Sequence, residues 1–177
     1  MNDYFNFRRL FVSGAIATLV AGPALAISKG RAIKLVESLI GEISLMINSV
    51  KTETELTSTF ELIVAKYADM NVISRSTLGP RARGASESEL RTFKKAFQRY
   101  FARKYSKQFL NFSGNQIILK DTQDRGKFFE VGASIIVDGS SNIDVNFRVS
   151  DRSGEPRFFD IILEGISLLA SERVEIG

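Results

Sequence analysis

The spacing of apolar residues changes once along this chain, near Gly114, and that change constrains the fold more than any other feature. Before Gly114, apolar residues recur every three or four positions, as in amphipathic helices, whereas after it they alternate with polar residues, as in strands with one buried face. Short loops between consecutive strands favour antiparallel pairing. We therefore predict an α+β domain in which a helical layer covers one face of a curved sheet.

Four strands are expected in that sheet. The third is the clearest, because Ile143, Val145, Phe147 and Val149 alternate with polar residues. The four ranges are 116–120, 127–137, 142–150 and 157–163.

Helices are expected before the strands, with one more after them. The clearest begins at Ser86, because Glu89 three residues later completes a capping-box pattern. Its exposed positions are mostly basic, which suits either a solvated face or contact with anionic lipid heads or an acidic partner. The ranges are 28–49, 54–67, a short turn at 70–79, 86–112 and finally 166–174.

The first 26 residues have the pattern of an export signal. Arg8 and Arg9 precede a short apolar run at 11–20, and Ala24-Leu25-Ala26 is a small-x-small cleavage site. The apolar run is shorter than the roughly 20 residues that span a membrane, which favours a cleaved signal over a permanent anchor. The paired arginines are similar to a twin-arginine signal, and an ordinary secretory signal is the alternative. We expect one domain at 27–177.

Composition excludes several classes of function. The chain contains no Cys and no His, so it lacks disulfides, the commonest general base and the commonest zinc ligand. Residues 27–177 hold 22 basic and 19 acidic side chains, a net charge of +3, which is too weak to argue for nucleic acid. We expect a protein that is not an enzyme and has no cofactor or metal.

Two acidic residues near the end of the last strand form the best candidate carboxylate pair. On one strand Asp160 and Glu164 would lie about 13 Å apart, beyond the span of about 5–9.5 Å of paired glycosidase carboxylates. We expect instead that Asp160 pairs with Arg148 across the strands and that Glu164 ends its strand.

The fourteen phenylalanines either fill a core or line a cavity. An apolar stripe of Phe usually packs a core, and the alternating pattern alone leaves both possibilities open.

Several motifs, in their order and spacing, resemble one family. They are Tyr67-Ala68-Asp69-Met70, the 73–79 segment ending in Leu78-Gly79, Phe93-Lys94-Lys95-Ala96-Phe97 with Tyr105, the 111–114 turn, Asn146-Phe147-Arg148-Val149 and the 160–169 segment. Together they are similar to the MlaC family of periplasmic phospholipid-binding proteins, also called toluene-tolerance proteins. The chain departs from that pattern at Pro156-Arg157, where a Gly-Trp pair is common, and in its short C-terminus.

The resemblance implies an NTF2-like fold with a lipid cavity between a four-stranded sheet and the helices. It also implies a monomeric periplasmic carrier that shuttles phospholipid between an inner-membrane ABC transporter with an MCE-domain subunit and an outer-membrane lipoprotein complex, maintaining outer-membrane lipid asymmetry. A carrier of hopanoid or another lipid, and a non-catalytic interaction module with a closed core, are the alternatives. The expected lipid-binding residues are Leu78, Phe93, Phe97, Phe101, Val145, Phe147, Phe159, Ile161 and Leu163.

Overall fold

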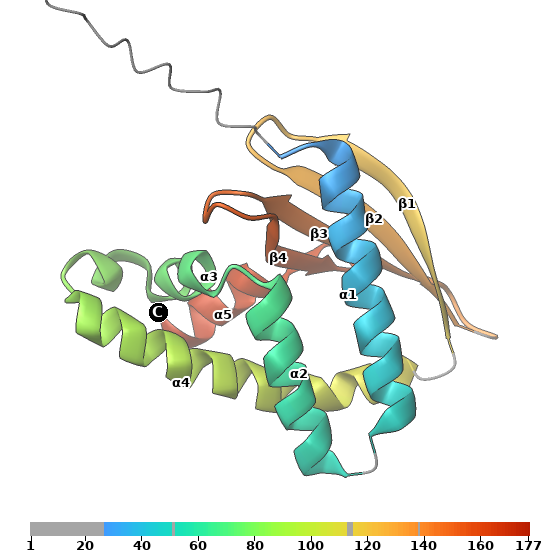
Figure 1. Cartoon of the computed structure of the whole chain (residues 1–177), viewed down its shortest axis with the longest axis horizontal. Coiled ribbons are helices and arrows are strands. Elements are labelled where there is room, and N and C mark those ends of the chain that lie inside the picture. The colour runs from blue at the N-terminus through green and yellow to red at the C-terminus, as the bar shows by residue number, and fades with distance from the viewer. Residues whose placement is uncertain (1–26, 51, 113–114, 138) are drawn as a thin grey trace, which may run out of the picture.

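The computed structural model describes residues 27–50, 52–112, 115–137 and 139–177. Within these residues, five α-helices and one five-stranded antiparallel sheet confirm the α+β class (Figure 1). The predicted signal segment 1–26 and the turn positions 113–114 and 138 lie outside the described residues. No helix in the described part of the chain is long and apolar enough to cross a membrane.

The helices begin where the sequence supplies capping side chains. Each N-cap residue accepts a hydrogen bond from a backbone N–H in the first turn, which satisfies a donor that has no partner within the helix. The predicted capping box at Ser86 and Glu89 is confirmed. The helices are α1 Lys29–Ser49, α2 Glu53–Tyr67, α3 Met70–Leu78, α4 Glu87–Tyr105 and α5 Leu168–Ile176, with 3₁₀ segments η1 Gly79–Arg83 and η2 Ser106–Phe112.

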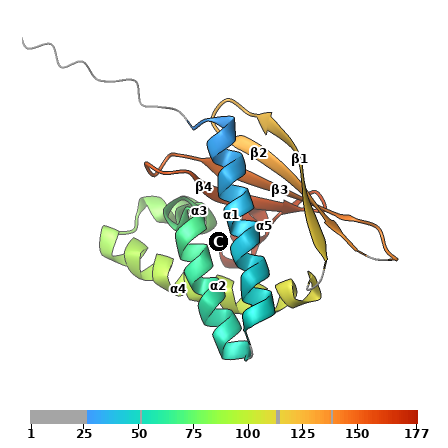
Figure 2. The same ribbon diagram turned by 45° about the vertical axis from the view of Figure 1, so that its right-hand side comes forward.

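The sheet is a meander in chain order. The strands are β1 Gln116–Asp124, β2 Phe129–Ile136, β3 Ile143–Ser150, β4 Arg157–Leu163 and β5 Ile166–Ser167. In Figures 1 and 2, α1 lies along the sheet, and it contacts β1, β2 and β3. Helix α2 packs on α1 and α4, which builds the helical side of the domain.

The fifth strand corrects the prediction of four strands and of a helix beginning at Ile166. Glu164 and Gly165 have φ angles of 49° and 80°, so the chain reverses in a two-residue turn. Ile166 then pairs with Leu163, and α5 begins only at Leu168. The likeness to NTF2-like folds stays a prediction.

The expected basic helix is also shorter than predicted. Regular α-helical structure ends at Tyr105, and the chain continues as η2 rather than as one helix to residue 112. This segment matters for the space between helices and sheet, because Gln108 and Phe109 of η2 line it.

Residues at the junction of α2 and α3 fasten the helices to the sheet. The Asp69 N–H donates to the Phe158 carbonyl on β4 at 2.7 Å. The buried Asp69 carboxylate caps α3 through the Val72 N–H and accepts a hydrogen bond from Ser153 Oγ. Asp69, in the Tyr67-Ala68-Asp69-Met70 motif, therefore has a structural role.

Candidate functional site

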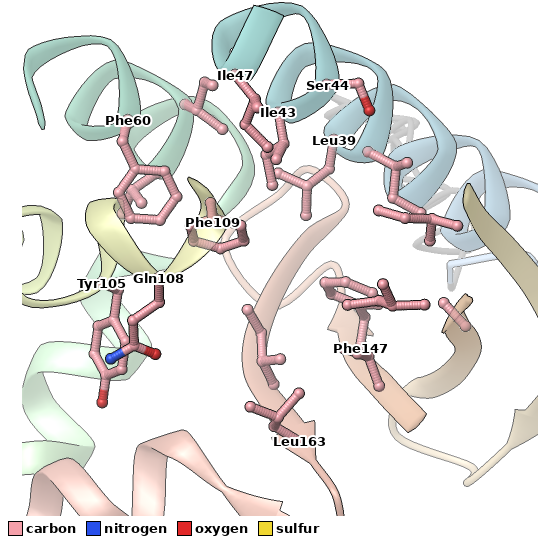
Figure 3. Close-up of a pocket in the computed structure, with 18 of the residues that line it drawn as sticks. Leu39, Ile43, Ser44, Ile47, Phe60, Tyr105, Gln108, Phe109, Phe147 and Leu163 are labelled. Atoms are coloured by element: carbon pink, nitrogen blue, oxygen red, sulfur yellow. The ribbon is translucent and has the colours of Figure 1, made fainter. Parts of the chain in front are cut away.

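An apolar cavity of about 340 Å³ lies between the helices and the sheet (Figure 3). Its volume falls in the range of about 300–1,000 Å³ that is usual for small-molecule sites. Packed protein interiors normally leave few voids larger than a water molecule, so a space of this size is not ordinary core. The lining comes from α1, α2, the C-terminal end of α4, η2, β1 to β4 and α5.

Helix α1 supplies one complete wall. Its lining side chains recur at helical spacing, and Figure 3 shows those of Leu39, Ile43 and Ile47 pointing toward the sheet. The six α1 residues that line the cavity are Leu39, Ile40, Ile43, Ser44, Ile47 and Asn48.

Alternate residues of the sheet form the opposite wall. Ala133, Val145 and Leu163 lie side by side across β2, β3 and β4, and Phe147 pairs with Ile161 one step along the same face. Because side chains alternate between the faces of a strand, all five point toward the helices. The sheet residues in the lining are Ile117, Ala133, Ile135, Val145, Phe147, Phe158, Ile161 and Leu163.

Aromatic side chains from α2, α4 and η2 close one end of the cavity. The ring centroid of Phe60 lies 4.8 Å from that of Phe109 and 6.5 Å from that of Phe101, and Phe101 lies 4.5 Å from Tyr105. Ile63 and Val64 of α2 and Leu168 of α5 complete the lining.

The polar groups of the cavity are few and neutral. Besides Tyr105, whose hydroxyl donates to Glu172, the polar side chains in the described lining are Ser44, Asn48, Gln108 and Asn115, and this lining contains no charged residue. The described lining can therefore bury hydrocarbon and offer hydrogen bonds to a ligand. No group of three or more acidic, His or Cys side chains among the described residues could hold a metal ion.

The structure brings five of the nine predicted residues together in this lining. They are Phe101, Val145, Phe147, Ile161 and Leu163. The other four, Leu78, Phe93, Phe97 and Phe159, are described residues that lie outside the lining.

Two of these four residues belong to helix α4. Only its last turns reach the cavity, through Phe101 and Tyr105. Phe93 and Phe97 lie further toward its N-terminus, where the Phe97 ring packs between those of Phe93 and Tyr100. They fill a neighbouring part of the core, so only the C-terminal end of α4 lines the cavity. Leu78 belongs to the end of α3.

A β-bulge explains the position of Phe159. Arg148 pairs with Asp160, but the next residue, Val149, pairs with Phe158, so Phe159 is the extra residue on β4. The bulge shifts the alternation, and Phe158 faces the cavity instead. Phe159 packs its ring against Phe128, beyond the cavity lining, with centroids 5.4 Å apart.

Half of the lining residues that the prediction omitted, nine of eighteen, come from α1 and α2. The sequence signal was present, because Leu39, Ile43 and Phe60 belong to the apolar stripes of the first two predicted helices. A stripe shows which side of a helix is buried, but it does not distinguish a cavity wall from a filled core.

Behind the aromatic end of the cavity lies a buried carboxylate, Glu172 on α5. It accepts hydrogen bonds from Tyr105 Oη at 2.5 Å and from Lys104 Nζ at 2.7 Å. Burial, followed by the hydrogen bond to Glu172, raises the pKa of Tyr105. Burial alone would lower the pKa of Lys104, but its hydrogen bonds to Glu172, Glu175 and Tyr100 outweigh burial and raise it. This network joins α5 to the last turns of α4, which line the cavity.

The fold is similar to that of a phospholipid-binding protein from Ralstonia solanacearum, whose structure was solved in complex with a phospholipid. The TM-score is 0.72 at 13% identity, over 81% of this chain and 84% of the other. No curated protein sequence matches the chain. The family model described as MlaC protein matches residues 37–177, which include the whole cavity lining. This chain is therefore a member of the MlaC family.

Proposed function

We propose that this protein is a phospholipid carrier that encloses the acyl chains of its cargo in the cavity between α1, α2 and the sheet. The observation that carries the proposal is the cavity itself, an apolar space of about 340 Å³ whose lining includes no charged side chain among the described residues. Family membership and the phospholipid complex of the Ralstonia solanacearum protein support the same cargo.

The energetics of lipid transfer suit such a cavity. Moving two acyl chains of about 15 methylenes each from a bilayer into water costs on the order of 24 kcal/mol, at about 0.8 kcal/mol per CH₂. A carrier has to offset most of this cost and still release the lipid to a membrane. Side chains such as Ile43, Phe147 and Leu163 offer hydrocarbon contact without fixed polar anchors, which favours release.

The neutral polar residues of the lining suit the glycerol end of a lipid. Ser44 and Asn48 lie one turn apart on α1, and Gln108 and Asn115 belong to the segment that joins α4 to the sheet. Their hydroxyl and amide groups can bond to ester oxygens without requiring a particular headgroup charge.

The proposed location and partners follow from the family and from the N-terminal sequence. The protein is exported to the periplasm and cleaved after Ala26, which leaves a single lipid-binding domain at 27–177. There it exchanges lipid with an inner-membrane ABC transporter that carries an MCE-domain subunit and with an outer-membrane lipoprotein complex. The partners supply direction, because a soluble lipid carrier without a nucleotide site has no energy source of its own. N-terminal sequencing of periplasmic material tests the export, and an uncleaved, membrane-bound product would contradict it.

Lipid extraction tests the cargo. The protein is purified from cells without detergent, its lipids are extracted, and mass spectrometry identifies and counts them. We expect diacyl phospholipid in stoichiometric amounts. A hopanoid or another lipid would change the cargo assignment, whereas lipid-free protein that also fails to bind added phospholipid would favour an interaction module.

A further inference from the structure

Helix α4 carries a row of basic side chains spaced four residues apart. Arg91, Lys95, Arg99 and Arg103 are all exposed, and residues four apart are neighbours on a helix surface. At a rise of 1.5 Å per residue, the row extends over about 18 Å. We call these four residues the basic ridge.

The charges of the basic ridge are largely unneutralised within the molecule. Among the described residues, no side chain makes a hydrogen bond or ion pair with Arg91, Lys95 or Arg103. Arg99 has one distant partner, Glu61 at 3.9 Å, and is 68% exposed.

Basic residues elsewhere on α4 contrast with the ridge. Lys94 Nζ donates to Asn71 Oδ1, and Lys104 binds Glu172 and Glu175. The helix therefore uses these two lysines to hold its own fold, whereas the ridge directs its charges to solvent.

Stability of the helix does not account for the basic ridge. Like charges four residues apart disfavour a helix, and the ridge contains three such pairs in succession. The cost would be offset by an anionic surface that neutralises the row.

A shallow depression lies beside the ridge, lined by Ala96, Arg99, Tyr100, Arg103 and Lys104. Tyr100 and Lys104 are held by Glu175, so this side of the depression is fixed by the fold. The depression offers a place for a lipid headgroup between two exposed guanidinium groups.

The chemistry around the ridge favours a membrane over a protein as its partner. Protein interfaces depend on large apolar or aromatic anchors, and none of the exposed large hydrophobic side chains of the described residues lies on α4. Attraction to an anionic bilayer needs only basic residues close to its surface. We propose that the basic ridge docks this protein on the surface of a bilayer that contains anionic phospholipid.

This inference goes beyond the proposed cargo, because surface docking by α4 does not require a lipid in the cavity. Its experiment is therefore separate from lipid extraction. The full chain is expressed, the N-terminus of the purified protein is determined by mass spectrometry, and binding is measured by co-sedimentation with vesicles of phosphatidylcholine alone or mixed with phosphatidylglycerol.

A triple variant removes three of the four charges of the basic ridge, and a control variant removes three charges elsewhere. Arg91→Gln, Lys95→Gln and Arg103→Gln keep helix-forming side chains at exposed positions. The control, Lys29→Gln, Lys34→Gln and Lys127→Gln, removes three exposed basic residues away from α4. Circular dichroism and the unfolding midpoint verify that both variants are folded.

We expect the wild type to bind vesicles with phosphatidylglycerol at about 0.01 M salt, and to be released at about 1 M, because the Debye length falls from about 30 Å to about 3 Å. The ridge variant should lose on the order of a hundredfold in partition coefficient, and the control at least tenfold less. Equal losses in the two variants, equal binding to neutral vesicles, or no binding of the wild type to anionic vesicles would overturn the proposal. In the last case an acidic protein surface becomes the better partner for the ridge.

Discussion

Arg148 on β3 and Asp160 on β4 face each other across the sheet, with Nη1 of the guanidinium 3.2 Å from Oδ2 of the carboxylate. The sequence predicts this pair, and the structure confirms it. Asp160 is 4% exposed and also accepts hydrogen bonds from Ser167 Oγ at 2.8 Å and the Leu169 N–H at 3.1 Å. One buried carboxylate thus joins β3, β4 and the start of α5.

The Asp160→Asn variant should lower the free energy of unfolding without emptying the cavity. The amide keeps the shape but loses the charge that Arg148 and two other donors require, which costs about 1–3 kcal/mol. Urea unfolding measures the loss, and lipid extraction measures the cargo.

The matched change is Asp121→Asn, because Asp121 is exposed on β1. We expect it to change stability by less than about 0.5 kcal/mol. If folded Asp160→Asn protein carried no lipid, Asp160 would have a role in binding that its position outside the cavity lining does not explain.

Phe158 and Phe159 show how far the sequence predicts the site. Alternation counted back from Leu163 and Ile161 places Phe159 on the cavity side, and that count is correct until the bulge inserts one residue. A bulge depends on pairing with the neighbouring strand, so the sequence of β4 alone does not show it.

The fold class and the apolar faces were predictable because they depend on local spacing. The order of helices and strands, the capping box at Ser86 and the inward face of β3 all follow from residues close together in the chain. The path of α4 and the empty space beneath α1 depend on tertiary packing. A stripe of apolar residues is the same whether the facing volume is filled or open.

The bulge leads to a prediction for two adjacent phenylalanines. Phe158→Ala removes a ring that is 4% exposed and lines the cavity, so it should cost about 3–5 kcal/mol and reduce bound lipid. Phe159→Ala should cost less and leave the lipid content unchanged, since its ring packs on Phe128. Extraction of lipid from both variants distinguishes them, and the reverse order would contradict the register of β4.

Stability in alkali should depend on the network around Glu172. The pKa values of Lys104 and Tyr105 are raised above their usual 10.5 and 10.0, so the folded protein keeps two protons that the unfolded chain releases as pH rises past about 10. The free energy of unfolding therefore falls with pH in that range, and it is undiminished below it.

Tyr105→Phe removes one of these two protons. We expect the alkaline slope of the free energy of unfolding to decrease by up to about 1.4 kcal/mol per pH unit. At neutral pH the variant loses the hydrogen bond to Glu172, which costs about 1–3 kcal/mol. Urea unfolding at a series of pH values measures both effects. An unchanged slope would show that Tyr105 does not hold its proton in the folded state.

Substitutions at two valines on the inner face of β3 can distinguish a cavity from a packed core. Val145 lines the cavity, and Val149, four residues along the same face, is fully buried outside its lining. Val145→Trp can place its ring in open space, so it should displace lipid with little change in stability. Val149→Trp has no such space and should overpack the core at a cost of about 1–3 kcal/mol or more.

Bound lipid and the unfolding midpoint, measured on both variants, give opposite patterns for the two residues. Val145→Trp should be stable and depleted of lipid, and Val149→Trp should be destabilised yet, where folded, still loaded. If Val145→Trp were destabilised as strongly as Val149→Trp, the space beside Val145 would be filled by protein in solution. Because the depressions beside Tyr100 and beside Gly132 are open and lined in part by charged side chains, neither could enclose acyl chains in its place, and that result would remove the physical basis of the carrier proposal.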